Sequence, residues 1–126
     1  LITIWSEENK YKIWLDVEIA AAQAMEKLGQ IPKGVSLTVR KKAKINVKRI
    51  HAIETKVKHD VIAFLTNLAE YIGPDSRYIH MGMTSSDLLD TSMALQCKQA
   101  GKIILKRLKE FRSCLRKKAK EHKIIA

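Results

Sequence analysis

The sequence predicts an all-α fold, with a helical N-terminal domain over residues 1–83 and the start of a long-helix bundle over residues 84–126. Apolar residues recur every three or four positions through most of the chain, which is the period of a helix with one buried face. Glycine and proline fall between these stretches, where helices end and turns begin. At 126 residues the chain is the size of one ordinary domain and can bury a core.

The first helix is expected to begin after Ser6 and to end at Gly29. Serine is a favoured N-cap, and the acids Glu7 and Glu8 suit the positive end of the helix dipole. Glycine commonly ends a helix, and Pro32 then opens the next segment. One face of this helix carries a polar exception, Glu18, among apolar residues: Tyr11, Trp14, Leu15, Ala21, Ala22, Met25 and Leu28.

Three shorter helices should follow. The first spans residues 35–43, and Asn46 is placed to cap the second, which runs through Val57. The third covers 61–72 and ends at the strong turn signal Gly73-Pro74-Asp75. We expect a second loop over 77–83.

The longest element should begin after Thr84 and reach about His122. Its apolar residues step by three or four without a break: Leu89, Met93, Cys97, Ala100, Ile104, Leu108, Phe111, Leu115 and Ala119. Such a helix is on the order of 57 Å long, whereas a small domain is nearer 30 Å across. This chain supplies too few partners for it, so we expect a helical bundle within an oligomer. The first residue is Leu1 and the last lies in a charged helical pattern, so we expect a piece of a longer protein.

The composition of the chain argues against membrane-spanning, secreted and disulfide-rich proteins. No apolar run approaches the roughly 18 to 20 residues of a membrane helix, and no basic segment followed by an apolar one resembles a secretory signal. Two cysteines are too few for a disulfide framework and form no Cys-x-x-Cys pair. We therefore expect a cytoplasmic protein with no membrane partner. The net charge of +11 is concentrated in residues 41–49 and 106–123, and it indicates either a solvated lysine-rich surface or an anionic partner.

The first stretch that could carry chemistry is Lys58-His59-Asp60. It places a cation, an imidazole and a carboxylate side by side at a helix junction. The residues alone leave two interpretations open. Asp60 could simply cap the following helix, with Lys58 and His59 exposed, or the three could contact a ligand.

The second stretch runs from His80 to Asp87. Thr84 and Asp87 stand in the relation of a capping box, which accounts for both of them. It does not account for Ser85, for Gly82, which permits close backbone approach, or for the imidazole upstream. A helix start with free N–H groups and hydroxyls can bind a carboxylate or phosphate, so a substrate site here is the alternative to a structural cap.

These residues resemble the N-terminal part of the adenylosuccinate lyases, which belong to the fumarase/aspartase superfamily. The resemblance covers essentially the whole chain. It rests on Lys58-His59-Asp60-Val61 with Ala63-Phe64, and on His80-x-Gly82-x-Thr84-Ser85-Ser86-Asp87-x-x-Asp90-Thr91. It also includes Ile4-Trp5-x-x-Glu8-Asn9-x-Tyr11, Trp14-Leu15-x-Val17-Glu18 and Ala119-Lys120-Glu121-His122-Lys123. The second signature is shared with the carboxymuconate cycloisomerases, and the pair His59-Asp60 favours the adenylosuccinate branch.

The resemblance implies a β-elimination without metal or organic cofactor. It would release fumarate from adenylosuccinate, giving AMP, and from the succinyl-carboxamide ribotide of purine biosynthesis. Thr84 and Ser85 would bind a succinyl carboxylate, and Lys58, His59 and Asp60 would contact substrate. His80 would line the same site, with His80 and His59 in supporting roles.

The main acid–base pair of the family has no counterpart within residues 1–126. His122 does not match the family's catalytic histidine, because no glycine follows it. The resemblance also implies a homotetramer whose active sites combine residues of several subunits, so the fragment alone should be inactive.

Other classes remain as alternatives. A basic helical module that binds nucleic acid would explain the charge, but aromatic residues are only 6% of the chain and no reader motif is present. A purely structural oligomerisation bundle would explain the long helix and leave His59-Asp60 and residues 80–87 without a role. A carboxymuconate cycloisomerase-like protein is the alternative within the same superfamily.

Overall fold

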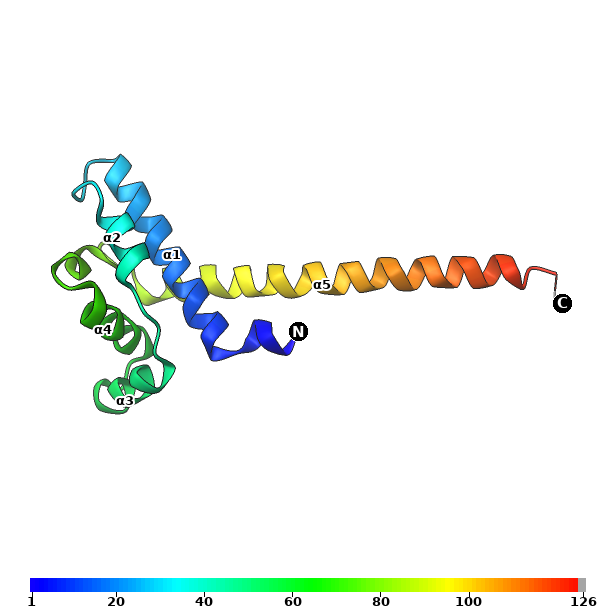
Figure 1. Ribbon diagram of the computed structural model, residues 1–126, viewed down its shortest axis with the longest axis horizontal. Coiled ribbons are helices and arrows are strands. Elements are labelled where there is room, and N and C mark those ends of the chain that lie inside the picture. The colour runs from blue at the N-terminus through cyan, green and yellow to red at the C-terminus, as the bar shows by residue number, and fades with distance from the viewer. Residues whose placement is uncertain (125–126) are drawn as a thin grey trace.

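The computed structural model describes residues 1–124 and is all-α, as the sequence predicts. Four helices gather at one end of the molecule, and a fifth extends far beyond them (Figure 1). The gathered helices are α1 (Glu7–Lys27), α2 (Val35–Lys42), α3 (Val47–Val57) and α4 (Asp60–Ile72), and the long helix is α5 (Ser85–Glu121). Two short 3-10 helices, η1 (Ile2–Trp5) and η2 (Pro74–Tyr78), complete the described part; residues 125 and 126 of the predicted second domain lie outside it.

Most helix ends follow the local signals in the sequence. The Ser6 hydroxyl accepts a hydrogen bond from the Asn9 N–H at 3.3 Å, and Asn46 Oδ1 accepts one from the Arg49 N–H at 3.1 Å. Gly29 has φ +70°, a left-handed conformation that suits glycine after a helix. These three predictions are confirmed.

The segment between α4 and α5 is more regular than predicted. A turn at residues 73–75 and a loop over 77–83 were expected, but residues Pro74–Tyr78 form η2. Proline at the first position of η2 suits a helix start, since its missing N–H would have had no intrahelical partner. Helix η1 also had no clear signal in the sequence.

Aromatic rings from α1 and α4 form the centre of the core. Tyr11, Trp14 and Phe64 are essentially inaccessible to solvent. The Trp14 ring is nearly perpendicular to the rings of Tyr11 and Phe64, with centroid distances of 5.2 Å to Tyr11 and 5.3 Å to Phe64. The rings of Tyr11 and Phe64 are stacked, with their centroids 5.8 Å apart. Such arrangements are the favoured geometries for aromatic pairs, so this cluster fixes α1 against α4.

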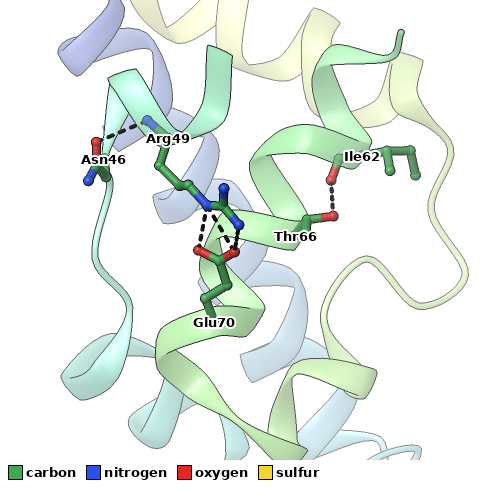
Figure 2. Close-up of polar contacts among 5 residues, drawn as sticks. All are labelled: Asn46, Arg49, Ile62, Thr66 and Glu70. Carbon is green, nitrogen blue, oxygen red and sulfur yellow. Dashed lines mark hydrogen bonds and ion pairs between the residues drawn. The ribbon is translucent and has the colours of Figure 1, made fainter. Parts of the chain in front are cut away.

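Helices α3 and α4 form a hairpin that an ion pair joins on its surface (Figure 2). The Arg49 Nε–H donates to both carboxylate oxygens of Glu70, at 3.0 and 3.1 Å. On the same helix as Glu70, the Thr66 hydroxyl donates to the Ile62 carbonyl at 2.7 Å. The ion pair holds the end of α4 close to the start of α3.

Only the first part of α5 packs against the rest of the chain. Its buried residues are Leu88, Ser92, Gln96 and Ala100, and Gln96 Nε2 donates to the Ile4 carbonyl at 3.0 Å. From residue 102 onward every described residue is exposed. The helix is on the order of 55 Å long, so about half of it projects away from the other helices (Figure 1).

Most of the predicted apolar stripe of α5 does not face the core: Ala100 is buried and Leu89 is partly buried, but Met93 and Cys97 are exposed. The exposed fractions of Ile104, Leu108, Phe111 and Leu115 are 48%, 55%, 60% and 52%. The face that packs against α1 and η1 is the neighbouring one and includes the polar residues Ser92 and Gln96. The stripe is therefore free in this chain, as expected of a helix that needs further partners.

Candidate active site

Two residues of the predicted site have an unusual backbone conformation. Lys58 has φ +56° and His80 has φ +62°, and within the described residues these are the only two non-glycine positions with positive φ. The left-handed region is unfavourable for residues with a side chain, and such positions concentrate at functional sites. Lys58 lies two residues before the start of α4, and His80 lies five residues before the start of α5.

The segment Lys58-His59-Asp60 forms the junction between α3 and α4. His59, rather than Asp60, is the N-cap of α4, because His59 Nδ1 accepts a hydrogen bond from the Ile62 N–H at 3.4 Å. The alternative in which Asp60 caps the helix is therefore wrong by one residue. Asp60 is the first helical residue, where its Oδ1 accepts from the Val61 N–H at 2.7 Å. Negative charge there suits the positive end of the helix dipole.

The side chains of His59 and Asp60 at this junction remain accessible. His59 Nδ1 and Asp60 Oδ1 lie 3.6 Å apart, and their side chains are 45% and 42% exposed. Water screens a pair of this kind, so it contributes little to stability. Lys58 is also exposed, so all three side chains are free to contact a ligand.

A hollow of about 470 Å³ opens beside Lys58, lined by His51, Glu54, Thr55 and Lys58. Carboxylates are concentrated near it. Burial, followed by the negative charges of Glu7, Glu54 and Asp60, raises the pKa of Tyr11 to about 12. Lys58 therefore lies beside several acidic groups; a second cation, Lys10, has its Nζ 4.4 Å from the centroid of the Tyr11 ring.

The second segment is fixed by a buried carboxylate on α1. Glu18 Oε1 lies 2.6 Å from His80 Nδ1, and Glu18 Oε2 accepts a hydrogen bond from the His80 N–H at 2.9 Å. The Glu18 side chain is wholly buried and that of His80 is 14% exposed. Burial raises the pKa of Glu18, and the hydrogen bonds and charge of His80 counter part of that rise.

The start of α5 combines a structural cap with free hydroxyl groups. Thr84 and Asp87 form the predicted capping box, in which the Thr84 N–H donates to Asp87 Oδ2 at 2.9 Å. The capping interpretation of these two residues is confirmed. Ser85 is half-buried, and its hydroxyl has no hydrogen-bond partner among residues 1–124. An unpaired hydroxyl at a helix start is a suitable donor to an anion.

The two segments lie at different places along α1. Asp60 is close enough to Tyr11 to influence its ionisation, whereas His80 contacts Glu18. Tyr11 and Glu18 are seven positions apart, or roughly 10 Å along a helix. In the described part of the chain no hydrogen bond or ion pair joins residues 58–60 to residues 80–85. A single chain therefore holds two separate groups of candidate residues.

Glu18 is the residue whose role the sequence did not reveal. The sequence marked it only as a polar residue on an apolar helix face and as the last residue of the motif Trp14-Leu15-x-Val17-Glu18, and neither observation indicates a partner. The contact with His80 spans 62 positions of sequence, so no local pattern indicated it.

The described residues include neither a metal-binding cluster nor a membrane-spanning helix. Residues 1–124 contain no cluster of three or more His, Cys, Asp or Glu side chains that could hold a metal ion. None of the helices described combines the length and the apolar character needed to cross a membrane.

The all-α fold, with one long helix of which about half is free, agrees with the helical lyases of the fumarase/aspartase superfamily. The model of the lyase family matches residues 1–126, and the chain belongs to that family. The fold class and the family expected from the sequence are both confirmed.

Relatives with a stated activity are similar over nearly the whole chain. It is 49% identical over 120 residues to an adenylosuccinate lyase of Thermotoga maritima, which is 95% of this chain and 28% of that protein. It is 46% identical over 120 residues to the adenylosuccinate lyase of Synechocystis, with the same coverage. For that of Streptococcus mutans the identity is 46% over 123 residues, 98% of this chain and 28% of the relative. The chain thus spans little more than a quarter of the length of these proteins.

Two crystal structures share the fold. A fumarate lyase from a Mesorhizobium species superposes with a TM-score of 0.82 at 22% identity, over 90% of this chain and 27% of that one. A β-carboxy-cis,cis-muconate cycloisomerase from Acinetobacter calcoaceticus gives a TM-score of 0.70 at 29% identity, over 79% of this chain and 25% of that one. The first supports the fold alone.

Proposed function

We propose that this chain is the N-terminal part of a lyase that eliminates fumarate from adenylosuccinate, giving AMP, and from the succinyl-carboxamide ribotide of purine biosynthesis. The observation that carries the proposal is the start of α5, where His80, held by Glu18, precedes the capping residue Thr84 by four positions and the unpaired hydroxyl of Ser85 by five. The similarity to three adenylosuccinate lyases supports the choice of substrate.

The proposed chemistry requires donors for negative charge and two proton transfers. A base removes a carbon-bound proton, the electrons of that bond form the new C=C bond, and the C–N bond breaks as an acid protonates the nitrogen. Thr84, Ser85 and the free N–H groups of α5 are suited to bind a succinyl carboxylate, whose charge increases during proton removal. Proton transfer and charge stabilisation need only side chains and backbone, so the proposal includes no cofactor and no metal.

The remaining site residues have supporting roles in the proposal. The exposed Lys58, His59 and Asp60 would contact other polar groups of the nucleotide. His80 would help to hold the substrate. The main acid and base would come from outside residues 1–126, and an imidazole in His59 or His80 would assist proton movement at most.

The proposal extends to organisation. Residues 1–83 would form the N-terminal domain and residues 84–126 the first helix of a central bundle, in a cytoplasmic homotetramer with shared active sites. The exposed stripe of α5 supports the bundle, since a long apolar face in water is unfavourable. Cys97 and Cys114 are free and exposed, which suits a reducing compartment.

A cycloisomerase of the same superfamily is the second candidate, because one such enzyme shares the fold at 29% identity. A nucleic-acid-binding module has less support. Arg49, part of the first basic cluster, is paired with Glu70, and the exposed charges of α5 are those of a solvated helix.

The test is an assay of the full-length protein with each substrate. We expect fumarate release from adenylosuccinate and from the succinyl-carboxamide ribotide, and no conversion of carboxymuconate. Conversion of carboxymuconate alone would replace the proposal by the second candidate. Absence of both activities, with DNA binding that falls steeply with salt, would favour the nucleic-acid module.

A further inference from the structure

Glu18 is a buried carboxylate for which the proposed reaction has no direct use. It lies on the core face of α1, near the middle of the helix, and its side chain is completely inaccessible to solvent. Ionisable groups are rarely buried unless they are paired, because removing a charge from water is costly. The only partner that the structure provides for Glu18 among residues 1–124 is His80, which contacts both of its oxygens.

The two contacts constrain both the backbone and the ring of His80. The backbone N–H donates to one oxygen of Glu18, and Nδ1 of the ring faces the other. His80 adopts the left-handed conformation, which a residue with a side chain holds only when its surroundings compensate. The bidentate contact with Glu18 supplies that compensation.

The other ring nitrogen remains free for a different partner. No hydrogen bond to His80 Nε2 is formed by the described residues, and the buried side-chain atoms without a partner are Asn67 Nδ2 and Ser92 Oγ. Nε2 is therefore not fully buried, and the His80 side chain as a whole is 14% exposed. The Met83 N–H donates to the His80 carbonyl at 3.3 Å, and this turn leads directly into Thr84 and the start of α5.

We propose that Glu18 is a positioning residue for the reaction. Its carboxylate accepts a hydrogen bond from the protonated Nδ1 of His80, so that the other ring nitrogen, Nε2, faces the substrate bound at Thr84 and Ser85. The role of the substrate in this statement rests on the proposed function. A carboxylate that fixes the tautomer and orientation of an imidazole is a recurring device in enzymes, both in catalytic triads and behind metal ligands.

The spectroscopic test measures the protonation of Nδ1 directly. The full-length protein is labelled with 15N-histidine, and the His80 resonances are identified by their loss in a His80→Gln variant. We expect the chemical shift of a protonated nitrogen at Nδ1. An unprotonated Nδ1, with the proton held by Glu18 instead, would overturn the proposal. This measurement needs no substrate and no activity.

The kinetic test compares two matched substitutions on α1. Glu18→Gln keeps the shape of the side chain but places an amide where two donors of His80 converge. Glu26→Gln is the control, because Glu26 also accepts a backbone N–H, from Ser36, and has no histidine partner. We expect Glu18→Gln to lower kcat/KM by roughly 10- to 100-fold, and Glu26→Gln to change it by less than about twofold.

The outcomes separate this proposal from the proposed function. If kcat/KM of Glu18→Gln equals that of Glu26→Gln, whether both are unchanged or both are lowered, Glu18 has only a structural role and the proposal is overturned. A wild-type protein without fumarate release would overturn the proposed function, and the Nδ1 resonance would still decide whether Glu18 orients His80.

Discussion

At the scale of single residues, the candidate site depends on side chains that keep one polar group without a hydrogen-bond partner among the described residues. Nδ1 of His80 is occupied by Glu18 and Nε2 is not. Thr84 is half of a capping box, whereas the hydroxyl of the adjacent Ser85 has no partner among the described residues. The sequence indicated both His80 and Ser85, because the capping box accounts for Thr84 and Asp87 but not for them. It could not indicate Glu18, since the residue that Glu18 contacts is 62 positions away.

Replacing Ser85 by alanine should impair substrate use much more than stability. If the hydroxyl binds a substrate carboxylate, the loss of a charge-assisted hydrogen bond costs about 1.5 to 3 kcal/mol. This corresponds to a decrease in kcat/KM of roughly 10- to 150-fold. Steady-state kinetics of the full-length protein, together with its Tm, provide the measurement. Ser86→Ala is the control, because Ser86 is exposed on the next position of the same helix. A lower Tm with normal turnover would show that Ser85 only supports the helix start.

At the scale of elements, four of the five described α-helices begin where a local side chain accepts a hydrogen bond from a free N–H group; in α2 the Ser36 N–H donates instead to Glu26, ten positions away. Ser6, Asn46 and the box of Thr84 with Asp87 act over three residues, and for this reason these starts could be predicted from the sequence. The start of α4 was predicted less well, since His59 rather than Asp60 accepts the capping bond. The ion pair that joins α3 to α4 was not predicted, because Arg49 and Glu70 are 21 positions apart.

The ion pair of the α3–α4 hairpin should make stability depend on pH in the acid range. The Arg49 guanidinium lowers the pKa of Glu70 below its ordinary value of 4.5. A lowered pKa in the folded state means that the contribution is present above pH 4.5 and is lost as the pH falls through the folded-state pKa. Glu70→Gln should therefore lower the Tm slightly at neutral pH, and the difference should disappear in acid. Both side chains are partly exposed, so added salt should also reduce the difference. A difference that persists in acid would contradict this explanation.

At the scale of the whole molecule, a packed cluster of four helices contrasts with the free half of α5 (Figure 1). The residues of α5 that pack are Leu88, Ser92, Gln96 and Ala100, and two of these four are polar. The apolar stripe through Ile104, Leu108, Phe111 and Leu115 faces solvent instead. A helix of this kind gains most of its stability from burying an apolar face, so the free half of α5 is suited to pack against further helices, as the proposed bundle requires.

Residues 1–126 in isolation should show no lyase activity and should self-associate. An elimination needs a base and an acid within about 3 Å of the groups they act on, and the proposal places both outside this chain. The exposed stripe exceeds the apolar patch that a monomer usually tolerates. Fumarate release and light scattering by the purified fragment are the measurements. Turnover close to that of the full-length protein would show that His59 or His80 is the true acid.

The helices, most of their ends and the family can be predicted from the sequence, because they depend on residues within a few positions of one another or on contiguous motifs. The buried face of α5, the contact between Glu18 and His80 and the left-handed conformations of Lys58 and His80 depend on how the helices pack. Helical periodicity specifies which residues share a face of a helix. It does not specify which of two neighbouring faces of α5 packs against the other helices of this chain. Contacts between distant positions arise from the way whole helices pack together, and the geometry of His80 depends on such a contact.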